Sequence, residues 1–262
     1  MKRKTAGNVI RAQGAAFKLI EQYGFRHPSE IDLEAVALDR GIKVRHGGLS
    51  GCEARLLRVG DRGTIRVRDP NLKAPRTRFA IAHEIGHWEL HKTSQAFVCT
   101  RETLRDYKTD PMEAEANFFA SELLMPAAMV RPIIKANEPS LRTAELISDE
   151  FAVSLTAASI KVFMETQHEC VLVMSKDGFT SWWMSGSERY GIWLQSKQRV
   201  SPHSVAYYVG AEPRGDSAPE LVPTDAWFLH FEEPERIEVS EESVALGGTG
   251  YVISMLSISN TE

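Results

Sequence analysis

The sequence predicts an α+β protein, with a mainly helical first part that carries a small β-hairpin or sheet and a β-rich C-terminal region. Apolar residues recur at spacings of three and four along much of residues 5–165, which is the period of an amphipathic helix. Beyond this stretch, short runs rich in Val, Ile and aromatic residues favour strands. We therefore expect two domains, residues 1–167 and residues 168–262.

The composition is that of an ordinary globular protein. Of 262 residues, 43% are hydrophobic and 25% are charged, and the sequence shows neither a run of 18 or more apolar residues nor a secretion signal. We expect a soluble, cytoplasmic protein.

Three widely separated cysteines indicate neither a disulfide framework nor a thiolate metal site. A formal net charge of -4 argues against nucleic-acid binding driven by a positive surface. The basic cluster of Lys2, Arg3, Lys4 and Arg11 is expected to be a solvated helix start or a frayed tail.

Four helices are expected in the first half of the chain. Asp32 is a typical N-cap for the second helix, which should end before Gly41, and Asp110 followed by proline is a typical start for the fourth. The helices are expected at about residues 5–23, 32–40, 75–91 and 110–125.

A β-hairpin is expected between the second and third helices. Residues 53–59 and 64–69 are rich in Leu, Ile, Val and Arg, and a Gly-Asp-Arg-Gly turn separates them. The residues around Ile42 and Val44 also look strand-like. One hairpin strand could be an edge that pairs with an extended substrate, or both could be covered structural strands.

Residues 141–165 are expected to form two short helices that are broken near residues 151–154. This pair is similar to a helix-turn-helix, but its second helix has Lys161 as its one basic side chain. Phosphate and base contacts would be scarce, so we interpret the pair as a packing unit of the first domain.

The C-terminal region is expected to be a sheet. Residues 169–175 and 179–185 flank a Lys-Asp-Gly turn as a hairpin. Further strands are expected at residues 205–209, 237–239 and 251–258. Five aromatic residues could line a pocket but are more typical of a β core: Trp182, Trp183, Trp193, Tyr207 and Tyr208.

The third helix contains the motif H-E-x-x-H, with His83, Glu84 and His87. Four residues make about one helical turn, so both imidazoles face one side and can share a metal ion. Zinc fits because a catalytic zinc needs three protein ligands and keeps one position for water, whose pKa falls to roughly 7. Glu84 is then placed to take the proton of this water. The surrounding apolar residues favour a dry, rigid site over a solvated helix face.

The third ligand is expected on the fourth helix. His91 continues the spacing, but it lies about 12 Å along the helix axis from His83 and cannot share the metal ion. Glu113 is the favoured ligand and Glu115 the alternative, although Glu113 could also serve only in a capping box. Asn117 follows Glu113 by one turn and could orient a ligand by a hydrogen bond.

Two stretches together resemble the ImmA/IrrE family of metallopeptidases. They read RFAIAHEIGHW at residues 78–88 and EAEANFFASELLMP at residues 113–126, and the similarity covers roughly residues 8–165. The resemblance implies a zincin-like, more narrowly gluzincin-like, metallopeptidase core. It also implies one zinc ion on His83, His87 and Glu113, with Glu84 as the catalytic base.

The same resemblance implies a function and a partner. The chain would be a zinc-dependent site-specific endopeptidase that cleaves a helix-turn-helix (Xre-like) transcriptional repressor and so derepresses stress, phage or mobile-element genes. Its partner would be this protein substrate, with no membrane and no direct nucleic-acid contact. The alternative is a non-proteolytic zinc-fold regulator or toxin-antitoxin component that binds a repressor or DNA. For the donor that would stabilise the tetrahedral intermediate, His91, Arg101 and Tyr107 stay open.

Overall fold

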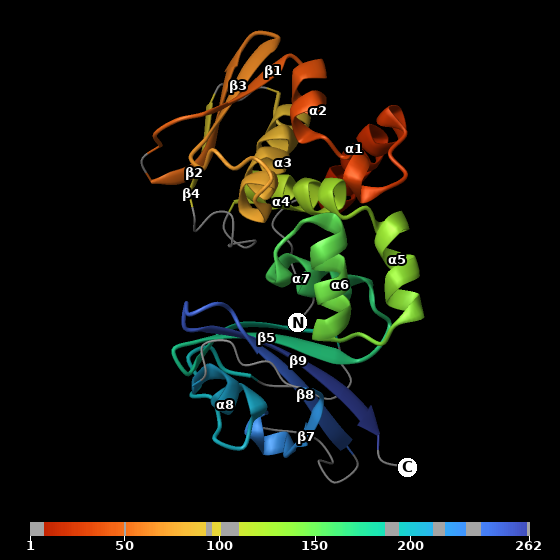
Figure 1. Cartoon of the computed structure of the whole chain (residues 1–262), viewed down its shortest axis with the longest axis vertical. Helices are drawn as coiled ribbons and strands as arrows, with labels where there is room; N and C mark the ends of the chain where they lie inside the picture. The colour runs from red at the N-terminus through yellow and green to blue at the C-terminus, as the bar shows by residue number, and fades with distance from the viewer. Residues whose placement is uncertain are drawn as a thin grey trace. The chain divides into compact units, whose positions relative to one another are not determined.

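The computed structural model describes residues 8–49, 51–92, 96–100, 110–186, 194–211, 218–228 and 237–260. Its helices and two sheets confirm the α+β class (Figure 1). The chain divides into two compact units, one with Lys2–Pro132 and Ile147–Ala157, the other with Ile133–Leu146 and Ala158–Glu262. The expected domain boundary after Gln167 stays a prediction. No helix in these described stretches is long and apolar enough to cross a membrane.

The first two helices begin and end at the residues that the sequence indicates. Helix α1 (Val9–Tyr23) ends at Gly24, which has a positive φ of 67° that suits glycine. Helix α2 (Leu33–Asp39) begins after Asp32, whose carboxylate accepts the backbone N–H groups of Glu34 and Ala35. A short 3₁₀ helix, η1 (Pro28–Glu30), lies between them.

The sheet of the unit that contains Lys2–Pro132 has the strand order β1-β3-β2-β4. Its strands are β1 (Ile42–His46), β2 (Cys52–Val59), β3 (Arg62–Val67) and β4 (Ala96–Thr100). The hairpin β2–β3 confirms the prediction, and β1 pairs in parallel with β3. The idea that the hairpin supplies an edge strand is wrong, because β1 covers β3 and β4 covers β2. Strand β4 was not expected, and it is one of the two edges.

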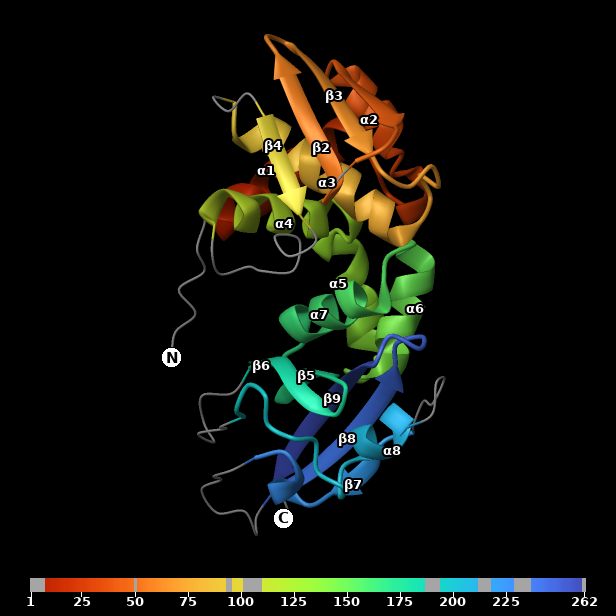
Figure 2. The ribbon, with the colours of Figure 1, turned by 90° about the vertical axis from the view of Figure 1, so that its left-hand side faces the viewer.

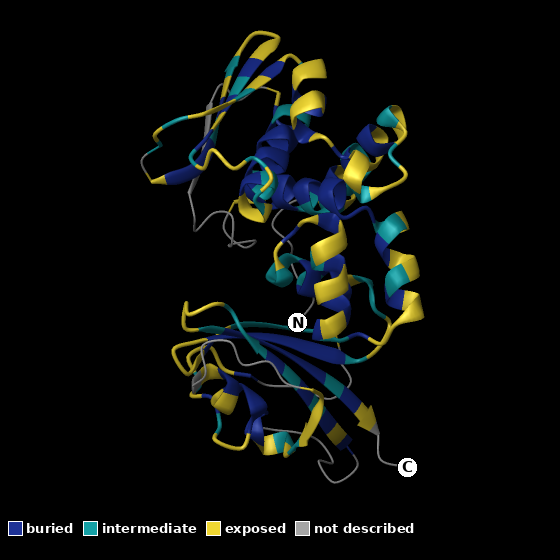
Figure 3. Cartoon of the chain, viewed as in Figure 1, coloured by how far each residue is buried: buried dark blue, intermediate teal, exposed yellow. Residues whose placement is uncertain are grey.

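Helices α3 (Pro75–Leu90) and α4 (Pro111–Leu124) form the centre of the unit. Each has proline in its first turn, and Asp110 caps α4 by accepting the backbone N–H of Met112 at 2.8 Å. Both are mostly buried, and α3 packs against α4 and the sheet (Figures 2 and 3). Two helices buried on nearly all sides can hold polar side chains away from water.

Gly86 permits the close approach of α3 and α4. A Cβ atom added at this residue would lie 3.0 Å from a ring carbon of Phe119 and 3.2 Å from the backbone Cα of Ala116. The backbone atom cannot turn aside as a flexible side chain could. Any larger residue therefore pushes α4 away from α3.

Gly86→Ala is expected to lower the free energy of unfolding. Overpacking costs about 1–3 kcal/mol, and the gain of about 1 kcal/mol in helix propensity offsets part of this cost, which leaves a net loss of up to about 2 kcal/mol. Gly14→Ala in α1 is the matched control, because its added Cβ would meet no atom within 4 Å. That change should raise the free energy of unfolding by about 0.5–1 kcal/mol. Chemical denaturation measures both, and equal effects in the two variants would contradict the packing argument.

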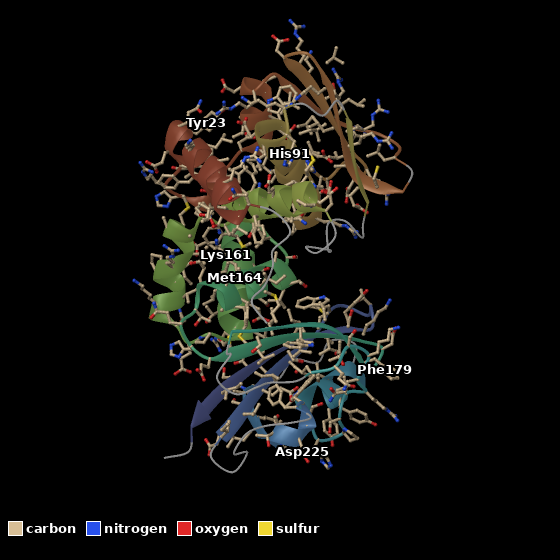
Figure 4. The ribbon with its side chains drawn as sticks, turned by 180° about the vertical axis from the view of Figure 1, so that it is seen from behind. Tyr23, His91, Lys161, Met164, Phe179 and Asp225 are labelled. Atoms are coloured by element: carbon tan, nitrogen blue, oxygen red, sulfur yellow. The ribbon has the colours of Figure 1, made fainter. Side chains whose placement is uncertain are left out.

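Three helices follow, α5 (Ala127–Ala136), α6 (Leu141–Phe151) and α7 (Leu155–Glu165). The break between α6 and α7 lies where it was expected, at Ala152, which has a positive φ of 50°. Lys161 lies on α7 (Figure 4). It is only 4% exposed, and its Nζ lies 3.2 Å from Oε1 of Glu165. This side chain cannot contact a phosphate without breaking that pair, which supports a packing role for α7.

The C-terminal unit is built on an antiparallel sheet of order β6-β5-β9-β8-β7. The strands are β5 (Cys170–Lys176), β6 (Phe179–Ser185), β7 (Glu220–Val222), β8 (Ile237–Ala245) and β9 (Tyr251–Asn260), and η2 (Thr224–Ala226) is a short 3₁₀ helix. Trp227 is buried at its core, and Trp183 packs partly buried against the same cluster. Trp182 is half-buried, and Trp193 lies outside the described residues.

The predicted strand at residues 205–209 is wrong, because this segment forms helix α8 (Val205–Ala211). The fully buried Glu241 accepts the backbone N–H groups of Val205 at 3.0 Å and Ala206 at 2.7 Å, which anchors the start of the helix. Tyr207 and Tyr208 are 42% and 64% exposed, so they do not fill the core as expected. A contact from a strand far along the chain thus overrides local β propensity.

Candidate metal centre

Helix α3 brings three polar side chains into the centre of its unit. His83, Glu84 and His87 all have no exposed surface. The two histidines are one turn apart, and their Nε2 atoms lie 3.0 Å from each other. The interior position comes from the apolar residues on both sides of the motif, which pack α3 against the sheet and α4.

Helix α4 adds a carboxylate to this pair. Oε2 of Glu113 lies 3.2 Å from Nε2 of His83, and its Oε1 lies 3.2 Å from Nε2 of His87. Among the described residues, these three form the one group whose ligand atoms could hold a metal ion, all within 4.8 Å of one another. Two ligands of a tetrahedral zinc ion, bound at about 2.0–2.1 Å, lie about 3.3 Å apart. The observed separations and the two-nitrogen, one-oxygen donor set therefore fit zinc.

Asn117 contacts the other side of the His83 ring. Its Oδ1 lies 2.9 Å from Nδ1 of His83, and the side chain is fully buried. With the amide in this orientation, Nδ1–H donates to Asn117 and Nε2 keeps its lone pair for a metal ion. The structure thus places Asn117 where the one-turn spacing after Glu113 led us to expect it.

Burial and local hydrogen bonds set the charges in this group. Burial lowers the pKa of His87 to about 4, against the opposing effect of Glu113. Burial alone would raise the pKa of Glu113, but its close contacts with His83 and His87 outweigh burial and hold that pKa well below its usual range. Burial also lowers the pKa of His91. At neutral pH, neutral imidazoles and an ionised Glu113 are the forms that ligate metals.

The alternative third ligand, Glu115, faces away from the two motif histidines. Its Oε2 lies 2.9 Å from Nη1 of Arg11 and 3.0 Å from Nε2 of His91, and its Oε1 accepts the backbone N–H of Asn8 at 2.9 Å. Arg11 lies in the first turn of α1 with its side chain 49% exposed, as expected of a solvated helix start, but no local pattern in the sequence indicates its pairing with Glu115. Arg101 and Tyr107 lie outside the described residues.

The residues around this centre match a known family. Residues 37–163 match the family model described as the IrrE N-terminal-like domain, of the peptidase M78 type. This part of the chain is an IrrE N-terminal-like domain. The match contains all three residues of the possible metal group, and it confirms the resemblance that the two sequence stretches indicate.

Two further proteins are similar to this chain. The "uncharacterized immunity region protein 2" of Bacillus phage phi105 is 29% identical over 123 residues, which are 47% of this chain and 73% of that protein. A solved structure described as a Mycobacterium tuberculosis transcriptional regulator has a TM-score of 0.61 at 17% identity, and the match covers 94% of this chain and 76% of that one. At this identity the second likeness concerns the fold alone.

The match to the IrrE N-terminal-like domain points to a metallopeptidase-type fold for residues 37–163. Within that fold, His83, His87 and Glu113 could bind a metal ion. A protease or a regulator-related protein of the ImmA/IrrE kind agrees with both observations.

Proposed function

We propose that this chain is a zinc-dependent site-specific endopeptidase, and that its substrate is a helix-turn-helix (Xre-like) transcriptional repressor in the cytoplasm. Cleavage of the repressor would release stress, phage or mobile-element genes from repression. The observation that carries the proposal is the buried group of His83, His87 and Glu113, with Glu84 fully buried on the same helix. A site that only stabilised the fold would not need this second buried carboxylate, which follows His83 directly in the sequence.

In the proposed mechanism, His83, His87 and Glu113 hold the metal ion and Asn117 orients His83. Zinc, when bound, acidifies a water molecule and polarises the carbonyl group of the peptide. Glu84 would take a proton from this water as a general base while the water oxygen bonds to the carbonyl carbon, and it would give that proton to the leaving amine as the C–N bond breaks. The apolar packing of α3 and α4 excludes other water molecules from the reaction.

The test uses a candidate Xre-like repressor encoded beside the gene for this chain. Zinc-loaded protein is expected to convert the repressor into two defined fragments, read by intact mass spectrometry, and chelation of the metal should stop the reaction. Readdition of zinc should restore it. Chelator-resistant cleavage would overturn the metal-dependent mechanism.

The second candidate is a non-proteolytic regulator that holds a repressor by contact. The name of the phage relative, an immunity region protein, agrees with either function. A folded, zinc-loaded chain that forms a complex with an intact repressor in size-exclusion chromatography would favour this second function.

A further inference from the structure

A series of hydrogen bonds leads away from the candidate metal centre through His87, whereas Asn117 contacts His83. Nδ1 of His87 lies 2.9 Å from Nδ1 of His91, and Nε2 of His91 lies 3.0 Å from Oε2 of Glu115. His91 is 6% exposed and Glu115 is 8% exposed, so water competes little for these contacts. Neither residue belongs to the possible metal group, and the proposed mechanism uses neither.

The donor and acceptor roles in this series of hydrogen bonds follow from Glu115, the residue at its far end. Glu115 accepts the backbone N–H of Asn8 and pairs with Arg11, and such donors stabilise the ionised carboxylate. A carboxylate can only accept, so Nε2 of His91 donates to it. The neutral ring of His91 then accepts at Nδ1, where Nδ1–H of His87 donates. Nε2 of His87 is left with its lone pair toward His83 and Glu113.

We propose that His91 and Glu115 are positioning residues that fix the tautomer and the ring orientation of His87 for metal binding. This inference rests on the proposed function only because both concern the same metal ion. Supporting partners of metal-bound histidines set ligand basicity and orientation, and their loss typically costs about 10–100-fold in metal affinity. Most such partners are a single carboxylate or carbonyl, whereas here a second imidazole stands between the ligand and the carboxylate.

Two arginines hold the backbone around His91 in place. Nη1 of Arg58 donates to the carbonyl oxygen of His91 at 3.2 Å, and Arg11 donates to the carbonyl oxygen of Leu90. The guanidinium of Arg58 also lies 3.9 Å from the centroid of the Trp88 ring. These contacts occupy carbonyl groups at the C-terminal end of α3, where cations are favourable. The His91 ring is therefore held from its own backbone as well as from its two side-chain partners.

The test is a matched pair of variants, His91→Gln and His91→Leu. A glutamine amide can accept from His87 and donate to Glu115, whereas leucine can do neither. His91→Leu is expected to weaken zinc binding about 10–100-fold in competition with a chelator, and His91→Gln to keep most of the affinity. The cobalt(II) absorption spectrum, which reports ligand geometry, should change in the leucine variant alone. Unfolding in the presence of chelator checks that both variants fold.

A double-variant cycle shows whether His91 and Glu115 act on zinc affinity together or independently. If His91 and Glu115 act together, His91→Leu/Glu115→Gln should lose no more zinc affinity than the worse single variant. Asn117→Ala combined with Glu115→Gln is the control, and its losses should multiply because Asn117 supports the other histidine. Unchanged zinc affinity in the folded variants, or multiplied losses in the first double variant, would overturn the inference. A wild type that binds zinc and cleaves nothing would contradict the proposed function alone, and one that binds no zinc would overturn both.

Discussion

Glu84→Gln is expected to lower the rate of repressor cleavage by at least roughly 10²–10⁴-fold, the usual contribution of a general acid or base. The amide has nearly the volume of the carboxyl group, but at neutral pH it cannot take a proton from water. The three candidate ligands are unchanged, so the variant should still bind one zinc ion per chain. Fragment formation and metal content, both by mass spectrometry, measure the two expectations.

Glu89→Gln is the matched control for this variant. Glu89 lies on the same helix and is half-buried, and its Oε1 lies 3.7 Å from Nε of Arg40. The same chemical change there should leave cleavage unaffected. Cleavage at the wild-type rate by Glu84→Gln would remove Glu84 from the mechanism, whereas loss of zinc together with cleavage would indicate that Glu84 holds the site together instead.

Glu113→Gln is expected to weaken zinc binding more than any variant that only disturbs the orientation of a ligand, and so by more than about 10–100-fold. The reason is that the substitution removes the negative charge from the ligand group itself. His83→Ala should have a comparable effect. The affinity follows from competition with a chelator, and it has a second readout in unfolding. Zinc at 100 times its dissociation constant should stabilise the wild type by about 2.7 kcal/mol.

Glu122→Gln is the control for the ligand variant. Glu122 is also a buried glutamate of α4, but its carboxylate accepts the backbone N–H of Ala127 at 2.9 Å, and a glutamine oxygen can do the same. This variant should bind zinc as the wild type does. If Glu113→Gln also kept its zinc affinity, Glu113 would not be a ligand.

The parts of the fold that the sequence predicts well are those set by local rules. Asp32 and Asp110 cap helices because a short carboxylate reaches the free N–H groups of the next turn. Gly24 ends α1 because it adopts a positive φ at little cost. The motif histidines share a helix face by the same local geometry, and the one-turn spacing of Asn117 from Glu113 could be read in advance.

The parts that the sequence did not reveal depend on residues far apart along the chain. Helix α8 begins where Glu241 accepts its N–H groups, although its own residues favour a strand. Arg11 looked like part of a solvated basic cluster, yet it pairs with Glu115 across 104 positions. Helix α5 contains Pro132, which argues locally against a helix. In each case a tertiary contact or packing decides what the local pattern leaves open.

The two carboxylate oxygen atoms of Glu115 connect the start of α1 with His91, which contacts the candidate ligand His87. One accepts the backbone N–H that precedes α1, and the other contacts Arg11 of α1 and His91. If His91 positions a metal ligand, occupancy of the centre and docking of the first helical turn share a coupling free energy. Such coupling is reciprocal. If bound zinc raises the equilibrium constant for docking of α1 by a given factor, a partner that draws α1 away lowers the affinity for zinc by the same factor.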